Sequence, residues 1–401
     1  MNARLPPAVV RLMAARAGRS LGQGALVAAF ALYLRALGWS SVAIGATLSA
    51  ALLAGAALTL IVGPMSDRRG RRRFLLAYEL LQAAAALLAL LTASPSALVL
   101  AAIVGGFGRG ANGGAGPFSP LEQAWLAQAL PAARRGAVFS ANAAIGFCGM
   151  ALGALLAGGV QFLVRPLGEA LAYRPLFLLP LAGSVAAFAL IASLREPEQT
   201  LSPGRASAAS ERRSENRMLV RLVTANTLNG LGIGMIAPLM AYWFALRFDH
   251  GPGSIGPALA ASFVFGALGS IVAGRLVRRF GLIGPVVIMR GLGLALLVAV
   301  PFMPAFGLAA ALYALRGGFN QGTAGVRQAL VVGLTRERRG LAVSLQNVSI
   351  QIPRAIGPLL AGLMLDAGML RTPFIVAAVL QATYLVLYVW FFRGYAAGES
   401  E

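Results

Sequence analysis

The sequence contains no lysine, so its 34 basic residues are all arginines. A Walker A loop needs a lysine on the nucleotide phosphates, which excludes ATP hydrolysis by that route. The single cysteine, Cys148, excludes an internal disulfide and a cysteine-ligated metal cluster. The single histidine, His250, follows Asp249 in a predicted outer loop, where solvation is a simpler interpretation than metal binding. We therefore expect no metal and no cofactor, and no nucleophile–base pair indicates an enzyme.

Charged residues are also scarce, at 12% of the chain against about 25% in an ordinary soluble domain. Only 13 residues are acidic, which leaves a net charge of +21. A basic chain can indicate a nucleic-acid partner. Here, however, most arginines lie in short segments between apolar runs, on the side that the positive-inside rule assigns to the cytoplasm. We therefore expect a lipid bilayer as partner, no nucleic acid, and both termini in the cytoplasm of a bacterial inner membrane.

The apolar residues, 58% of the chain, form runs long enough to cross a bilayer, which takes about 20 residues. The pattern predicts an all-α polytopic membrane protein with twelve helices. These cover residues 10–36, 41–63, 73–93, 97–129, 136–163, 175–194, 217–246, 254–277, 283–303, 306–334, 340–365 and 372–392. The polar stretch 195–217 reads as a cytoplasmic linker. It divides the chain into six-helix bundles at 1–194 and 218–401.

A densely cationic segment, GPMSDRRGRRR, joins the second and third predicted helices. Gly63 can let a helix end approach a neighbour, and Gly70 can take the positive φ of a tight loop. Asp67 can place its negative charge on a helix N-terminus. Arg68 and Arg71 belong to the run that holds the loop in the cytoplasm. Arginine content alone would fit a plain topology signal, whereas the Gly–Asp–Gly spacing favours a gating latch.

The spacing Gly-x-x-x-Asp-Arg-x-Gly-Arg-x-Arg resembles the loop 2–3 signature of the major facilitator superfamily of secondary transporters. The resemblance implies two pseudo-symmetric bundles, with a substrate site between them near the membrane midplane. Repeats within the chain agree with this. The first signature recurs as Gly274-x-x-x-Arg278-Arg279-x-Gly281, and Gly153-Ala-Leu-Leu-Ala-Gly recurs as Gly357-Pro-Leu-Leu-Ala-Gly. Because Arg278 replaces the acid in the second copy, we expect asymmetric gating.

Ionisable and amide residues inside membrane helices are functional candidates because burying them is costly. The resemblance points to Arg109 in the fourth helix, with Asn112 beside it. Arg316, Asn320, Thr323 and Arg327 share one face of the tenth helix, and Ser344, Asn347, Gln351 and Arg354 share one face of the eleventh. Asn226 and Asn229 mark the seventh. These faces either line a cavity that favours an anionic substrate or form a network between helices.

Acids inside the predicted helices are few, and they are Glu79 and Glu122. The repeat places Glu122 opposite Arg327, so the two residues can form an ion pair that closes the cytoplasmic side. Glu122 can instead carry a proton, since burial favours the neutral form. The stretch from Gly149 to Gly159 resembles the efflux-associated motif of the superfamily's fifth helix, although Ala154 replaces its proline.

These features together favour a monomeric secondary transporter of a small organic molecule, anionic if the arginine faces line the cavity. Export coupled to protons is the favoured mode. The alternatives are a carrier for uptake or facilitated diffusion, and a membrane sensor that no longer transports.

Overall fold

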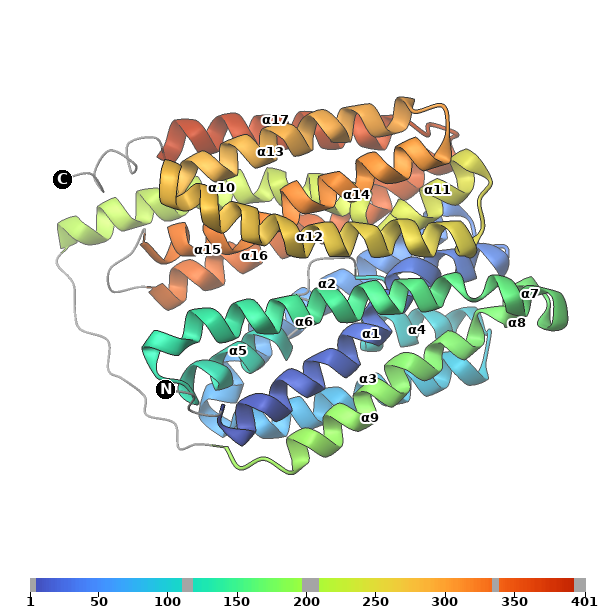
Figure 1. Cartoon of the computed structure of the whole chain (residues 1–401), viewed down its shortest axis with the longest axis horizontal. Helices are drawn as coiled ribbons and strands as arrows, with labels where there is room; N and C mark the ends of the chain where they lie inside the picture. Colours follow the sequence, from blue (N-terminus) through green and yellow to red (C-terminus); the bar gives the residue numbers. More distant parts are fainter. Residues whose placement is uncertain (1–4, 110–117, 197–208, 334–338, 393–401) are drawn as a thin grey trace. The chain divides into compact units, whose positions relative to one another are not determined.

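The computed structural model describes residues 5–109, 118–196, 209–333 and 339–392, and these residues are nearly all helical (Figure 1). The first half contains α1 (Pro7–Ala36), α2 (Ser41–Arg69), α3 (Arg71–Leu91), α4 (Pro95–Gly105), α5 (Phe118–Gln128), α6 (Ala132–Gly158), α7 (Gln161–Leu167), α8 (Glu169–Ala172), η1 (Arg174–Phe177) and α9 (Leu178–Ala192). The second contains α10 (Ala209–Ile236), η2 (Ala237–Leu239), α11 (Met240–Phe248), α12 (Pro252–Phe280), α13 (Ile283–Ala299), η3 (Val300–Phe302), α14 (Phe306–Gly322), α15 (Ala324–Gly333), α16 (Arg339–Asp366) and α17 (Thr372–Phe392).

Within the described residues, nine helices are long and apolar enough to cross a membrane. The other three of the twelve expected spans have identifiable interruptions. The apolar run of α1 contains Arg19 and Gln23. In the expected helix 97–129, α4 ends at Gly105 before a left-handed residue at Gly106, and the expected helix 306–334 is divided at Thr323 into α14 and α15. The all-helical architecture is thus confirmed, and the expected count of twelve spans is compatible with it.

The chain folds as two compact units, and each is described by itself. The first comprises residues 1–200 and 238–263, and the second comprises 201–237 and 264–401. The bundles expected at 1–194 and 218–401, with a linker at 195–217, stay a prediction, although α10 begins at Ala209, inside the expected linker. One segment of the second expected bundle is grouped differently here. That segment, 238–263, holds α11 and the start of α12 and groups with the first unit. Tyr242 belongs to it and bonds there with Ser41, at 2.8 Å between hydroxyl oxygens.

Tyr242 and Trp243 on α11 are 4% and 2% exposed, and Trp243 packs against Phe244 and Phe248. Helix α11 follows the 3-10 turn η2, and its residues from Met240 to Ala245 are all buried.

Helix α1 lies between α6 and α9 in the first unit (Figure 1). Small residues permit this close approach: a Cβ at Gly149 would stand 2.7 Å from the Ser20 Cβ, and one at Gly153 would stand 2.7 Å from the Ala25 nitrogen. Small residues of α6, the fifth predicted span, thus let this helix pack closely against α1.

In the second unit α10 packs in the same way against α16 and α17. A Cβ at Gly357 on α16 would stand 2.6 Å from the Gly234 Cα on α10. The pair α10–α16 therefore corresponds to the pair α1–α6, as the internal repeat predicted.

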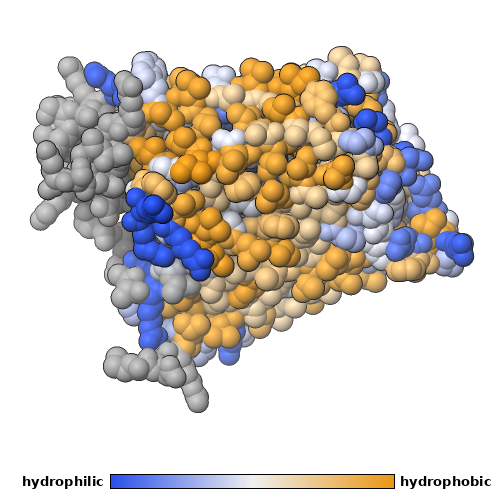
Figure 2. All heavy atoms as spheres, turned by 45° about the horizontal axis from the view of Figure 1, so that its top comes forward, coloured by the Kyte–Doolittle hydropathy of each residue, from blue (hydrophilic) through white to orange (hydrophobic). Residues whose placement is uncertain are grey.

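The outer surfaces of the helices are apolar, as a lipid environment requires. Leu80 and Leu91 on α3 are 62% and 70% exposed, and Val386 and Trp390 on α17 are 67% and 62% exposed. Figure 2 shows hydrophobic side chains over most of the drawn face, with hydrophilic ones gathered mainly toward its ends. Such a surface would be unfavourable in water and is favourable in a bilayer.

The cationic segment after Gly63 is not a loop, which corrects the sequence interpretation. Helix α2 continues to Arg69 and α3 begins at Arg71, so Gly70 alone makes the turn. Gly70 has the expected positive φ, of 91°. Gly63 lies inside α2, and a Cβ there would meet no described atom within 4 Å. The close helix approach expected at Gly63 is therefore absent from this conformation.

Candidate functional site

Glu122 on α5 is completely buried and lies at the centre of a cluster of charges within the first unit. Its Oε2 accepts a hydrogen bond from the Arg19 guanidinium at 2.7 Å, and its Oε1 accepts one from the Asn142 amide at 2.7 Å. Arg16 stands 4.0 Å from Oε2. Both Glu122 oxygens thus accept hydrogen bonds from their own unit. The ion pair of Glu122 with Arg327 stays a prediction.

Glu79 on α3 is also completely buried, but it is less well bonded. Its Oε1 lies 3.2 Å from the Nε of Arg19. Ser184 on α9 also interacts with Glu79, yet within the described residues neither Glu79 oxygen accepts a hydrogen bond of ordinary geometry. Arg19 therefore bridges two buried carboxylates, of which only Glu122 accepts hydrogen bonds of ordinary geometry from the described residues. We name Arg19, Glu79 and Glu122 the acid cluster.

Sequence analysis did not assign Arg19 to the site, because an arginine near the N-terminus fits a topology signal. A helical wheel would have found it. Arg16, Arg19 and Gln23 recur at i, i+3 and i+7, which places them on one face of α1 inside an otherwise apolar run.

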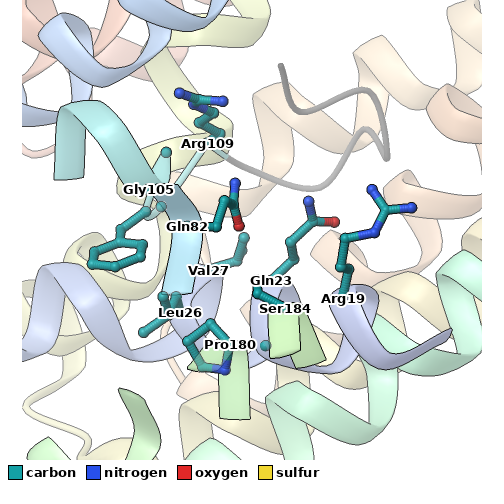
Figure 3. A pocket seen from close by; sticks show the side chains of 13 residues that line it. Arg19, Gln23, Leu26, Val27, Gln82, Gly105, Arg109, Pro180 and Ser184 are labelled. Carbon is teal, nitrogen blue, oxygen red and sulfur yellow. The ribbon is translucent and has the colours of Figure 1, made fainter. Parts of the chain in front are cut away.

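A small polar pocket adjoins the acid cluster (Figure 3). Its lining includes Arg19, Gln23, Gln82, Arg109 and Ser184, together with the glycines of residues 105–108. The polar ends of Arg19, Gln23 and Gln82 point to the same side in the close-up. The free space holds on the order of one or two water molecules, since each needs at least 10–15 Å³ for its centre. In this conformation the pocket suits water better than an organic ligand.

Arg109 follows the turn after α4 and is 5% exposed. Its guanidinium donates to the Tyr78 hydroxyl and to the Ile103 carbonyl oxygen, each at 3.3 Å. A Cβ at Gly55 on α2 would stand 2.9 Å from the Arg109 Cζ, so this glycine makes room for the side chain. The contacts fit the structural role that the sequence left open for Arg109. Asn112 lies outside the described residues.

The N-terminus of α3 does receive an anion, and the anion is Glu196. The carboxylate of Glu196 accepts the backbone N–H groups of Arg71 at 2.6 Å and Arg72 at 3.0 Å. The Arg72 guanidinium in turn donates to the carbonyl oxygen of Ala192, at 2.6 Å, at the end of α9. Arg68 is exposed and makes no such contact within the described residues, and the Asp67 side chain lies outside the described part.

The second unit contains a polar network that the sequence did not reveal. Arg290 on α13 is 4% exposed and donates to the side-chain oxygens of Asn229, at 2.7 Å, and Thr323, at 3.3 Å. Its Cζ lies 5.5 Å from the centre of the Tyr384 ring, a cation–π contact. Asn226 donates to the Ser349 hydroxyl at 3.3 Å. For Asn226, Asn229 and Thr323 the network interpretation therefore fits these contacts.

Two further arginines of this unit differ from Arg290. Arg316 on α14 and Arg354 on α16 are 6% and 4% exposed, and both act electrostatically on buried Tyr313. The Nε of Arg316 has no hydrogen-bond partner within the described residues. The remaining candidates, Asn320, Gln351 and Arg327, are half-buried. Arg316 and Arg354 are thus buried cations that both act on Tyr313, and the described part of this unit contains no buried acid.

No group of three or more histidine, cysteine, aspartate or glutamate residues that could hold a metal occurs in the described part of the chain. The chemistry that these sites can perform is therefore ion pairing, proton binding and anion recognition by buried side chains.

Comparisons with known proteins agree with this architecture. The sequence matches the family model of the Major Facilitator Superfamily over residues 12–225 and 222–400. A search of curated proteins finds no match. A mutant of the nucleoside transporter NupG has a TM-score of 0.73 at 13% sequence identity, with 96% of this chain and 100% of that chain covered.

Two more solved structures are similar over nearly their whole lengths. A bacterial homologue of the human lysosomal transporter Spinster, inward-facing and unoccupied, has a TM-score of 0.75 at 14% identity, covering 98% of each chain. The D-xylose–proton symporter has a TM-score of 0.71 at 15% identity, covering 95% of this chain and 96% of that one. At such identities the likeness establishes the fold alone.

The family match spans almost the entire sequence, and the chain therefore belongs to the major facilitator superfamily. It is a multi-pass membrane transporter and not an enzyme.

Proposed function

We propose that this major facilitator transporter exports a small organic anion in exchange for protons. The observation that carries the proposal is the burial of Arg316 and Arg354, each of which acts electrostatically on the buried Tyr313. Beyond the start of α10, the only acid in the described part of the second unit is the exposed Asp366. A carboxylate or phosphate ligand would bring an anion to these buried cations, because guanidinium groups bind both through paired hydrogen bonds.

Proton coupling is supported by the acid cluster of the first unit. Glu79 and Glu122 are buried, share Arg19, and adjoin a pocket of water size. Burying a carboxylate inside a membrane protein is energetically costly, so such a residue is a functional candidate. Reversible protonation is a function that alternating access can use.

The direction of transport rests on the resemblance of residues 149–159 to an efflux-associated motif. Positive segments between the helices support cytoplasmic termini and insertion in a bacterial inner membrane. We assign gating to Gly63, Asp67, Arg68, Gly70 and Arg71, and expect the chain to act as a monomer. Uptake of a metabolite is the alternative direction.

A thermal-shift screen tests the substrate class. The purified protein in detergent would be heated with benzoate, citrate and a sugar phosphate, and in parallel with a neutral sugar and a lipophilic cation. A ligand of the folded state raises the apparent unfolding temperature by mass action. We expect stabilisation by at least one anion. Stabilisation by only neutral or cationic compounds would show that the arginines are structural.

The variant Arg354→Ala locates the anion. A charge-assisted hydrogen bond contributes about 1.5–3 kcal/mol, so affinity for the stabilising anion should fall about 10- to 100-fold. The matched control is Arg275→Ala, at an exposed position of α12, which should bind the anion as the wild type does. Flux of that anion in proteoliposomes, with the proton gradient in either orientation, then distinguishes export from uptake.

A further inference from the structure

The two carboxylates of the acid cluster receive unequal support from their surroundings. Glu122 accepts two hydrogen bonds of 2.7 Å, one from Arg19 and one from Asn142, and Arg16 stands at 4.0 Å. Glu79 lies 3.2 Å from the Nε of Arg19 and also interacts with Ser184, but within the described residues neither of its oxygens accepts a hydrogen bond of ordinary geometry. Both side chains are completely buried.

This inequality decides which carboxylate is ionised in the observed arrangement. Burial of a carboxylate without strong partners is very unfavourable, and the usual response is to bind a proton. Glu122 has the donors that an ionised group requires, whereas Glu79 does not. A protonated Glu79 is neutral and can still accept the Arg19 Nε–H on its carbonyl oxygen.

The groups facing Glu79 come from three elements. Arg19 faces it from α1, Glu122 from α5, and the Ser184 hydroxyl from α9. One cation and one anion therefore act on Glu79 at close range. Loss of the proton would leave Arg19 facing two carboxylates, while Arg16 and Asn142 remain with Glu122. Every ionised carboxylate of the acid cluster therefore has an arginine nearby, whether Glu79 is protonated or not.

Water can reach the neighbourhood of Glu79. The pocket beside the cluster is lined by Arg19 and Ser184, the two residues that contact Glu79, and it is partly open. Figure 3 shows the side chains of Gln23 and Gln82 at the same pocket, which adds polar partners for water. Glu79 itself does not line this pocket, so a proton from pocket water reaches it past Arg19 or Ser184.

We propose that Glu79 is the proton-binding carboxylate of this transporter and that Arg19 is a counter-ion shared with Glu122. The proton adds to one Glu79 oxygen from pocket water, and Arg19 then interacts mainly with Glu122. Release of the proton draws Arg19 toward Glu79 and changes how α1, α3 and α5 are held together. This inference rests on the proposed proton coupling, and it names the residue that performs it.

Infrared spectroscopy tests the assignment without any substrate. The carbonyl stretch of a protonated carboxylic acid is separate from the carboxylate bands, so a pH difference spectrum of the purified protein reports the titrating group. We expect Glu79→Gln to remove the amplitude of one carboxyl group. The exposed control Glu169→Gln should retain it. Glu122→Gln should also keep the titrating carboxyl, but at a lower pH, because Arg19 is then left with Glu79 as its only carboxylate. If Glu79→Gln does not fold, Glu79→Asp should shift the frequency of this band.

The assignment is overturned if Glu79→Gln retains the band, or if Glu122→Gln removes it at every pH. The outcome is independent of the substrate. A band that depends on Glu79 alone, in a protein whose anion flux ignores the proton gradient, would disprove the proposed coupling and leave the proton site intact.

Discussion

The two units of the chain bury similar numbers of charges in opposite ways. The first unit pairs Arg19 with Glu79 and Glu122 through short, connected contacts, while its buried Arg109 bonds the Tyr78 hydroxyl and a carbonyl oxygen. The second unit buries Arg290, Arg316 and Arg354 without any buried acid among its described residues. The backbone repeat is conserved between α1–α6 and α10–α16, so the difference lies in the side chains and not in the packing of helices.

This difference separates two tasks within one repeated architecture. An internally compensated cluster can change its proton content and remain stable, because each state has a partner for each charge. A buried cation such as Arg316, whose Nε makes no hydrogen bond within the described residues, can bind an anionic ligand from outside the protein. We therefore expect substitutions in the first unit to affect mainly stability and coupling, and those at Arg316 and Arg354 to affect mainly ligand affinity.

Arg19→Met should give the largest loss of stability. It removes the only cation in direct contact with both buried carboxylates, and an uncompensated buried charge typically costs 3–5 kcal/mol. Thermal unfolding in detergent would measure the change. The control is the triple variant Arg19→Met, Glu79→Gln and Glu122→Gln, which removes all three charges and should recover most of the loss. Equal stability of the single and triple variants would mean that the charges are not coupled.

Arg290→Met should give an intermediate loss, because it leaves Asn229 and Thr323 without their bonds. An unsatisfied buried polar group costs about 1–3 kcal/mol. Arg316→Met is the matched control in the same unit, and it should cost less since the Arg316 Nε makes no hydrogen bond within the described residues. Thermal unfolding of the two variants compares them directly. A greater loss for Arg316→Met would contradict the view that this arginine is reserved for a ligand.

The spans of the fold were predictable because lipid imposes a simple length and polarity rule on each helix. The last predicted helix, 372–392, agrees with α17 at both ends. The partners of buried charges were not predictable, because Arg19 and Glu122 are 103 positions apart and no local pattern joins them. Arg290 was missed for the same reason, since its bonds go to α10 and to the junction of α14 and α15.

Helix breaks were only partly readable. The glycine-rich stretch after Gly105 indicated an irregular fourth span, and Gly106 and Gly108 do have positive φ. The segment from Gly63 to Arg69 was misread, because a run of arginines suggests a loop although arginine is a good helix former. Asp67 was predicted to place its charge on a helix N-terminus, and its side chain lies outside the described part. The anion observed at the N-terminus of α3 is Glu196, which is 125 positions from Arg71 in the sequence.

Gly63→Ala should have the smallest effect on stability, and a favourable one. Gly63 lies inside α2, and a Cβ there would meet no described atom within 4 Å. Alanine is favoured over glycine in a helix interior by about 0.5–1 kcal/mol, so the unfolding temperature should rise slightly. The matched opposite is Gly153→Ala on α6, where the Cβ would meet the backbone of α1 and should destabilise the unit. Gly274→Ala, the equivalent open position of the second unit, should behave as Gly63→Ala does.

The same variant examines the gating role proposed for Gly63. If another conformation of the transport cycle needs a close helix approach at this glycine, Gly63→Ala should slow flux in proteoliposomes although it stabilises the protein in detergent. Unchanged flux in a stabilised Gly63→Ala would show that the glycine is only a helix residue. A destabilised Gly63→Ala would mean instead that α2 is packed more closely in solution than the structure describes. Flux through Gly63→Ala therefore reports on gating only if the variant is at least as stable as the wild type.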